Sequence, residues 1–532
     1  MISTLSYLQQ LPKPKFNPNH QLIPISLAAG WSEEFPFEIR KELADYWGYG
    51  LFFGRVTHKN VEEAINNPRS VFGKVLQLAK SNPKKYPLDT YLDTQNFFRK
   101  PKINPSSYPD AFAHDNVGNL IKKFPNPEMR DETWQVIIEK LIAPLKRLAD
   151  EGVNFNVIQH WSEWFIPVVG HNASNLLNDP LIKAKYQDRL NNGEFKPNSN
   201  PSYDSFCNYL HLRKAYYEKM LADEVKAIAP NRNSYNIYTL NGGNDYGRYG
   251  GWGKWVDFVL NIGETCHISD YPGGSFYTIN GSFQNRGRYA NQINDLLSRL
   301  LASRGAELAV KHQFNQPWVW LRETSKTQKY LGFLRCAFLA GARGFISYLE
   351  PDDKSNYSYS QEINELNPPA WVTQVVELGY LSAQFSCLDR YLLEGDLLEG
   401  PFPHRFWAQH QYWKNHSPHP SYCLDNPFEI MTKGGWKNAI PGKVRIVARK
   451  LRNQDKYLLC AWATDGINRQ TWIELPNFGR FDVVAKPEGN LYEATMSSGE
   501  LLQVEIKSGL QAVFGSQGKT LSLQEINEIP LA

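Results

Sequence analysis

The sequence predicts an α/β protein, a (β/α)8 TIM barrel followed by a C-terminal antiparallel β-sandwich. Three observations lead to this prediction. Between about residues 20 and 350, strand-like apolar runs alternate with amphipathic helical stretches in eight units. From Lys443 onward, short strand-like runs are separated by turn residues at a spacing of roughly ten. The chain of 532 residues is long enough for a barrel and one smaller domain.

The first part of the chain is expected to form a parallel sheet, because parallel neighbours need helical crossovers. The predicted strands are Leu22–Ala28, Gly50–Val56, Leu88–Asp93, Asn154–His160, Tyr235–Leu240, Thr265–Ile268, Pro317–Leu321 and Phe345–Leu349. The predicted helices are Phe37–Tyr46, Val61–Ala79, Glu132–Ala149, Leu210–Ala227, Trp255–Leu260 (a helix or a turn), Ala290–His312, Gln328–Ala340 and Trp371–Leu388. An open doubly wound sheet is the competing arrangement, but no Gly-rich phosphate loop follows an early strand.

The chain is predicted to divide into three parts: a catalytic barrel over 1–394, a connecting segment over 395–440 and the sandwich over 441–532. The connecting segment is rich in Pro, His and Trp. The predicted sandwich strands are Val444–Lys450, Tyr457–Trp462, Thr471–Leu475, Phe481–Lys486, Leu501–Lys507 and Leu510–Phe514. Glycines at regular intervals supply the turns between them.

Composition excludes several classes of protein. The 58 basic and 54 acidic residues leave a net charge of +4 without a basic stripe, which argues against nucleic acid as a partner. No apolar run approaches the roughly 18 residues that a membrane span needs. The six cysteines are dispersed and contain no CxxC pair. The first residues do not form a signal-peptide pattern, so we expect a cytoplasmic protein or a secreted one whose leader has been removed. The oligomeric state stays open.

Two glutamates stand at predicted strand ends. Glu163 follows the fourth strand between Trp161 and Trp164, and Glu323 follows the aromatic seventh strand. Burial beside indole rings raises the pKa of a carboxyl group, which suits a general acid. Strand ends four and seven face each other across the mouth of a barrel, so the two carboxylates can divide acid and nucleophile roles around one glycosidic bond.

This pattern resembles the retaining glycoside hydrolases of clan A, in which the acid/base glutamate ends strand four and the nucleophile ends strand seven. The resemblance implies Glu163 as acid/base and Glu323 as nucleophile. It also implies that Arg55 after strand two and Tyr271 after strand six orient the nucleophile. The expected substrate is an oligo- or polysaccharide with β-linked sugars, cleaved with retention and without a cofactor. Ser162 stands where most of the clan has Asn.

Further polar and aromatic residues at the same ends are candidates for sugar binding. The full set is Arg55, Asp93, His160, Trp161, Ser162, Asn241, Trp252, Asp270, Tyr271, Trp320 and Glu350. We expect no metal site, because the group His416, His419 and Cys423 lacks a fourth ligand. Three alternatives remain: a glycosidase that uses Asp270 and Glu350, a transglycosylase, and a catalytically silent carbohydrate-binding barrel, which the Ser162 departure favours.

Overall fold

The structure is a computed structural model of the chain. It describes residues 2–28, 31–94, 104–161, 173–194, 203–237, 268–271, 273–277, 318–322, 328–347, 362–398, 444–463, 466–475, 477–498, 510–514 and 518–532.

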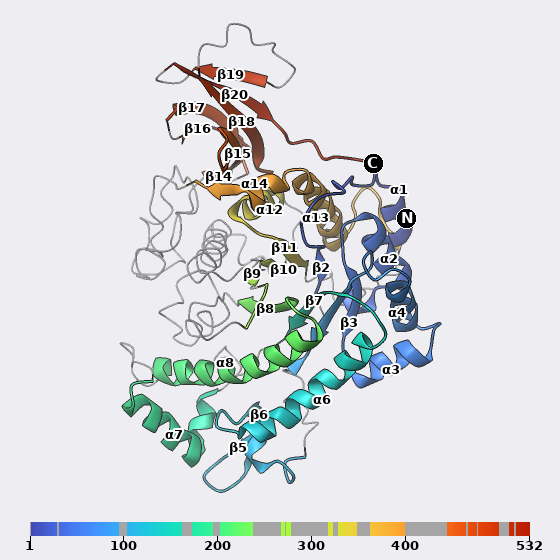
Figure 1. Cartoon of the computed structure of the whole chain (residues 1–532), viewed down its shortest axis with the longest axis vertical. Coiled ribbons are helices and arrows are strands. Elements are labelled where there is room, and N and C mark those ends of the chain that lie inside the picture. Colours follow the sequence, from blue (N-terminus) through green and yellow to red (C-terminus); the bar gives the residue numbers. More distant parts are fainter. Residues whose placement is uncertain are drawn as a thin grey trace.

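A parallel sheet of eight strands forms the centre of the first part of the chain (Figure 1). Its strands are β2 (Ser26–Leu27), β3 (Leu51–Arg55), β4 (Leu88–Leu92), β7 (Phe155–His160), β8 (Asn233–Ile237), β9 (Gly273–Tyr277), β10 (Trp318–Arg322) and β11 (Gly344–Ser347). They are hydrogen-bonded in the order β3-β4-β7-β8-β9-β10-β11-β2. Each strand from β3 to β11 therefore lies beside the next one in the sequence, and β2, the first strand, pairs with β11, the last. Every pairing between them is parallel. The predicted parallel sheet is therefore confirmed.

The two edges of this sheet meet where β2 and β3 begin. Ile25 and Tyr49 form a parallel bridge, and Ile25 exchanges hydrogen bonds of 2.9 Å with Gly48 and Gly50. Side chains from distant strands also meet inside the sheet. The Gln159 amide on β7 donates a hydrogen bond of 2.7 Å to the Ser26 hydroxyl on β2. These contacts bring the start of β2 beside the start of β3, and the Ser26 side chain beside Gln159 of β7.

Helices cover the outer face of the sheet (Figure 1). They are α2 (Phe37–Tyr46), α3 (His58–Asn66), α4 (Val71–Ser81), α6 (Asp131–Ala149), α8 (Tyr203–Ile228), α12 (Gln328–Ala340) and α13 (Ala370–Ser386). The predicted bounds of α2 and α12 are confirmed. The stretch predicted as one helix over Val61–Ala79 is two helices, because Pro68 lacks an N–H group and Ser70 caps the start of α4 by accepting from Gly73 N.

The sixth strand differs most from the prediction. It is β9, which begins at Gly273, whereas the sequence favoured Thr265–Ile268. Glycine is depleted in strands, so a strand that begins with Gly273 and Gly274 is not predicted from β-strand propensity. In the register of the sheet these two glycines lie opposite Trp318 and Val319 of β10.

Shorter elements complete the first part. They are β1 (Ile2–Ser3), α1 (Thr4–Gln10), η1 (Trp31–Glu34), η2 (Pro109–Ala111), β5 (Phe112–His114), β6 (Leu120–Pro125), η3 (Ala173–Asn178), α7 (Pro180–Asn191), β12 (Glu362–Ile363) and α14 (Asp389–Leu393). The sequence did not predict the β5–β6 hairpin. Predicted helices over Trp255–Leu260 and Ala290–His312 lie outside the described residues. No helix in the described part of the chain is both long and apolar enough to cross a bilayer.

The last part of the chain is an antiparallel β domain. A six-stranded sheet has the order β13-β14-β15-β18-β20-β19, and a hairpin of β16 and β17 lies beside it (Figure 1). The bounds are β13 (Gly395–Leu397), β14 (Val444–Leu451), β15 (Lys456–Ala463), β16 (Arg469–Leu475), β17 (Gly479–Ala485), β18 (Asn490–Ser498), β19 (Leu510–Phe514) and β20 (Lys519–Glu525). Sheet and hairpin share one apolar core, which includes Ile446, Leu459 and Phe481. The predicted strand Leu501–Lys507 lies outside the described residues.

The β domain packs on α12. Trp462, Val447 and Leu458 of the β domain belong to the same apolar core as Phe338 of α12 and Trp371 of α13. β13 lies in the segment predicted to be a connection, yet it pairs with β14. The tail after β20 runs back to the first part, where Leu531 forms a bridge with Pro14.

Candidate functional site

Polar and aromatic side chains gather at the carboxyl ends of the first four strands of the parallel sheet. Arg55 is the last residue of β3, Asp93 follows β4, and Glu33 lies in η1 after β2. Tyr91 lies near the end of β4, and Trp161 follows β7. We call these five residues the Arg55 cluster. Two of them, Glu33 and Tyr91, are absent from the set that the sequence predicted.

A bulge at Gly54 sets the direction of Arg55. The pairing of β3 with β4 shifts between Phe52 and Gly54, and Gly54 has a φ of 96°, which favours glycine. Beyond this bulge, the Arg55 backbone N–H donates a hydrogen bond of 3.1 Å to Glu33 Oε1. A Cβ atom at position 54 would lie 3.4 Å from that same oxygen, so the strand end and the carboxylate are closely fitted.

Tyr91 links the charged members of the cluster. Arg55 Nε donates to the Tyr91 hydroxyl at 2.7 Å, and the hydroxyl donates to Glu33 Oε1 at 2.9 Å. Burial and the Glu33 carboxylate raise the pKa of Tyr91, so the phenol keeps its proton. Burial lowers the pKa of Arg55, but Tyr91, Asp93 and Glu33 outweigh it and the pKa rises. The Tyr91 hydroxyl therefore bridges the Arg55 cation and the Glu33 anion through two hydrogen bonds.

Arg40 of α2 holds the backbone around Glu33. Its buried guanidinium donates to the carbonyl oxygens of Glu33 and Phe35 in and after η1, and to those of Phe52 and Phe53 in β3. Burial lowers the pKa of Arg40 to about 10, and the Glu33 charge opposes this shift. Because one side chain binds both segments, the η1 turn is fixed against the end of β3.

Asp93 and Trp161 extend the cluster along the sheet. Arg55 Nη1 lies 3.6 Å from Asp93 Oδ2, and the Tyr91 and Trp161 rings meet edge to face at 5.7 Å. The Trp161 backbone is fixed on both sides, since its N–H donates to Leu92 O and its carbonyl accepts from Thr94 Oγ1. The strand-end positions of Arg55, Asp93 and Trp161 are thus close together, as the sequence predicted for a shared strand-end surface.

The cluster can bind a polyhydroxylated ligand. The Arg55 and Glu33 side chains are 35% and 31% exposed, whereas Asp93 is 7% exposed. Arg55 offers donors, the Glu33 carboxylate offers acceptors, and the half-buried Trp161 ring offers a flat apolar face. A sugar presents hydroxyl groups and apolar C–H faces, which match these groups.

The predicted catalytic pair lies outside the described residues, as do Ser162, Asn241, Trp252 and Glu350. The strands before the pair are described. β7 ends at His160, three residues before Glu163, and β10 ends at Arg322, directly before Glu323. Trp320 lies within β10, opposite Ile346 of β11.

His160 occupies a different place from the one predicted for a sugar-binding residue. Its ring is buried and stacks on Tyr235 at 4.1 Å, and Nε2 lies 2.6 Å from Asn233 Oδ1. Burial lowers the pKa of His160 to about 4, against the opposing effects of Asn233 and Asp270. It is a neutral core histidine between the sheet and α8, with no surface for a substrate.

The prediction that Asp270 and Tyr271 follow the sixth strand is wrong, because β9 begins after them at Gly273. Both backbone N–H groups donate to Asn233 O, at the start of β8. Tyr271 contacts Arg232 at 3.3 Å, and Asp270 accepts from Asn233 N at 3.0 Å. They therefore lie at the amino-terminal end of the sheet, away from the Arg55 cluster.

Tyr277, rather than Tyr271, ends the sixth strand. It lies opposite Arg322 in the register of β9 and β10, one residue before Glu323. The sequence offered one signal for this position, an aromatic pair Phe276-Tyr277 after two glycines.

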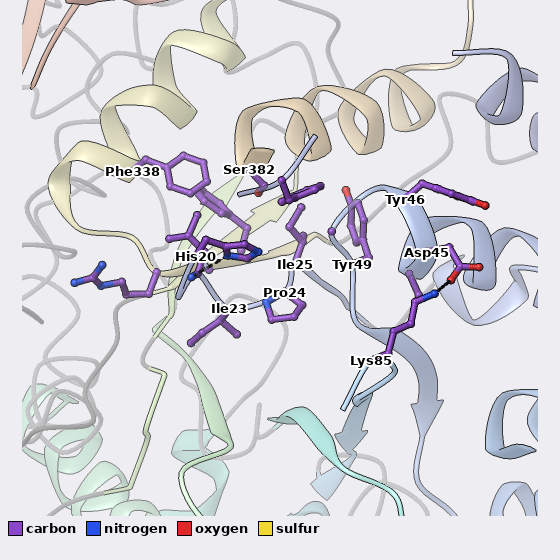
Figure 2. A pocket seen from close by; sticks show the side chains of 17 residues that line it. His20, Ile23, Pro24, Ile25, Asp45, Tyr46, Tyr49, Lys85, Phe338 and Ser382 are labelled. Carbon is purple, nitrogen blue, oxygen red and sulfur yellow. Dashed lines mark hydrogen bonds and ion pairs between the residues drawn. The ribbon is translucent and has the colours of Figure 1, made fainter. Parts of the chain in front are cut away.

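A cavity of about 200 Å³ lies at the opposite end of the sheet, where the strands begin (Figure 2). Its lining includes Ile25 before β2, Tyr49 before β3 and Gly344 at the start of β11. Asp45 and Lys85 form an ion pair of 2.7 Å at its rim. The length of the strands separates this cavity from the Arg55 cluster. In the described part of the chain, no group of His, Cys, Asp and Glu is placed to hold a metal ion.

No family model and no curated protein matches the chain. Similar solved structures include the apo exo-carrageenase GH42 from Bacteroides ovatus, with a TM-score of 0.46 and 10% identity over 91% of this chain and 84% of that one. The trehalose-6-phosphate hydrolase of Bacillus licheniformis has a TM-score of 0.38 and 10% identity, covering 96% and 98%. The alpha-amylase of Geobacillus thermoleovorans has 0.37 and 8%, covering 86% and 81%. Because these scores and identities are low, the function is inferred from this chain's own residues.

Proposed function

We propose that this chain is a glycoside hydrolase that cleaves β-linked glycosides or polysaccharides with retention at the anomeric carbon. One observation supports this above all. In a parallel sheet whose strands follow chain order, Glu163 comes after the fourth strand, β7, and Glu323 directly after the seventh, β10. Barrel enzymes carry their catalytic groups at the carboxyl ends of the strands.

The proposal includes closure of the sheet into a (β/α)8 barrel. The Ile25–Tyr49 bridge joins the two edge strands, and the hydrogen bond from Gln159 to Ser26 connects β7 with β2. Such contacts fit a closed sheet, whereas an open sheet keeps its edge strands apart. We propose the barrel for residues 1–394, a connection for 395–440 and a β-sandwich for 441–532.

The proposed chemistry has two steps. The Glu323 carboxylate attacks the anomeric carbon and the bond to the leaving oxygen breaks, while Glu163 gives that oxygen a proton. Glu163 then takes a proton from water, and the resulting attack releases Glu323 with the original anomeric configuration. Retention needs carboxyl groups about 5–5.5 Å apart, because a wider gap of about 6.5–9.5 Å admits water directly.

The Arg55 cluster would hold the sugar beside this pair. The partly exposed Arg55 guanidinium and Glu33 carboxylate can bind ring hydroxyls, and Trp161 can stack on the C–H face of a ring. Tyr91 and Arg40 keep these groups in place before the substrate arrives, which lowers the entropic cost of binding.

The test is a glycan-panel assay on the full chain, with the anomeric configuration of the first product read by NMR. We expect Glu323→Gln and Glu163→Gln to lower kcat by roughly 10²-fold or more without changing the fold seen by circular dichroism. Glu62→Gln is the matched control, because Glu62 is 55% exposed on α3. Full turnover by Glu323→Gln would remove the nucleophile assignment.

Two other results would redirect the proposal. An inverted first product would indicate a single displacement by water. Glycan binding without turnover across the whole panel would instead indicate the carbohydrate-binding barrel that Ser162 suggests.

A further inference from the structure

Two buried cysteines meet where the β domain packs on the parallel-sheet domain. Cys336 lies on α12 and Cys460 on β15, and their sulfur atoms are 3.7 Å apart although 124 residues separate them in the sequence. Both thiols are free, and both side chains are buried. The sulfurs must approach each other to about 2.0 Å for a disulfide to form.

Glycines make this close approach possible. A Cβ atom on Gly332 of α12 would clash with the Trp462 indole and lie 2.8 Å from Pro487 O. Gly489, which has a φ of 77°, faces Gly332 from the β domain, and its added Cβ would be 3.1 Å from Cys460 Sγ. The helix therefore lies directly on the β domain beside the two sulfurs.

Two arginines fix the relative position of the two sulfurs. Arg335, the neighbour of Cys336, donates from Nη1 to Gly489 O at 2.6 Å and to Glu488 O at 3.2 Å. From the other side, Arg449 of β14 donates to Leu339 O of α12 at 2.9 Å. Since each domain sends a buried guanidinium to backbone carbonyls of the other, the sulfurs are brought to a defined distance before any bond forms.

We propose that Cys336 and Cys460 are the site of a disulfide that joins α12 to the β domain when the chain folds in the presence of a small-molecule disulfide. One thiolate attacks the small disulfide and releases one thiol, and the other thiolate then attacks the mixed disulfide and releases the second. The protein loses two protons and two electrons, and the small disulfide gains them as two thiols.

Burial determines when this exchange happens. Burial, followed by the neighbouring Cys460 thiol, raises the pKa of Cys336, so little thiolate exists once the interface is closed. The bond therefore forms while the β domain docks on α12, and a chain that folded reduced stays reduced. Cys387 provides the contrast among the described cysteines, because it is exposed.

The test refolds the full chain with oxidised and reduced glutathione, blocks remaining thiols under unfolding conditions and maps the peptides by mass spectrometry. We expect the Cys336 and Cys460 peptides to be joined, and to separate after reduction. Blocked Cys336 and Cys460 in the oxidised sample, or either one joined to another cysteine, would overturn the proposal.

A second measurement follows thermal unfolding. The oxidised chain should unfold at a temperature roughly 5 °C higher than the reduced chain, because the bond closes a long loop. Cys460→Ala should abolish this difference, and Cys387→Ser should preserve it. Each comparison is made within one variant, so loss of stability in Cys460→Ala does not affect the result. An equal difference in Cys460→Ala would contradict the assignment.

Discussion

Tyr91 donates a hydrogen bond of 2.9 Å to Glu33, while the same hydroxyl accepts one of 2.7 Å from Arg55. The three residues come from β4, η1 and β3, so a single phenol oxygen connects the ends of three successive segments of the sheet. Its raised pKa means that this connection persists throughout the neutral pH range. The Arg55 cluster is thus a preformed surface in which each polar group has a fixed direction.

Replacing Tyr91 with Phe should weaken function more than stability. The ring stays against Trp161, but Arg55 and Glu33 lose their shared partner. We expect kcat/KM on a glycan found by the panel to fall roughly tenfold, and the free energy of unfolding to fall by about 1 kcal/mol. Tyr86→Phe is the control, since Tyr86 donates to Asp45 at 2.7 Å near the strand starts. Equal loss of kcat/KM in both variants would contradict a role for the cluster.

His160 should make stability depend on acid pH. Because its folded pKa is about 4 and its ordinary value 6.5, the unfolded chain takes up the proton first. The free energy of unfolding should therefore fall as pH drops from 6.5 to 4, by up to about 3 kcal/mol from this group. In His160→Asn this part of the slope disappears. The check is urea unfolding of the original chain and of His160→Asn between pH 4 and 8. If the free energy of unfolding has the same pH dependence in both proteins, His160 does not cause the effect.

Arg449 should contribute strongly to stability. Its buried guanidinium donates to Tyr391 O, Leu339 O and Gly395 O, and Arg449→Met leaves these carbonyls without that donor. We expect a loss of about 3 kcal/mol or more in denaturant unfolding. Arg452→Met is the matched control, because its ion pair with Asp396 is half exposed and should change stability by less than about 1 kcal/mol. Similar losses in the two variants would be the contrary outcome.

Gly332 should not tolerate a methyl group. In Gly332→Ala the added atom meets the Trp462 indole and Pro487 O, and we expect a loss of about 1–3 kcal/mol. Repeating the change in a Trp462→Leu background tests the cause, since a smaller side chain leaves room for the methyl group. The cost should then shrink by at least about 0.5 kcal/mol. The same cost in both backgrounds would show that the indole is not responsible.

Periodic patterns predicted the elements with continuous apolar faces. α2 and α12 begin and end where the sequence indicated. The hydrophobic pattern did not predict element boundaries that depend on proline or glycine. Pro68 divides one amphipathic stretch into α3 and α4, and β9 begins with two glycines whose partners lie on β10. The antiparallel strand β18 was missed although its apolar and polar residues alternate from Tyr492 to Ser497.

For the site, strand-end position suggested Asp93 and Trp161 and the family resemblance suggested Arg55, but neither predicted the contacts between these residues. Tyr91 lies inside the predicted strand Leu88–Asp93 and was not a candidate, and only the structure places its hydroxyl beside Glu33. His160 was misjudged for the opposite reason, because the last residue of a strand can face the helical layer as readily as the ligand. Asp270 and Tyr271 were assigned to the wrong end of the sheet because the sixth strand was predicted before them, whereas β9 begins after them. The assignments of Glu163 and Glu323 remain predictions.

The apolar core that runs from α13 through α12 into β15 has a consequence for how the molecule melts. A cut near residue 394 would expose Phe338 and its neighbours to water at the place where Trp462 and Leu458 now cover them. The parallel-sheet domain and the β domain are therefore expected to unfold together as one cooperative unit, although their architectures differ. Calorimetry should record one heat-absorption peak for both halves instead of two separate ones.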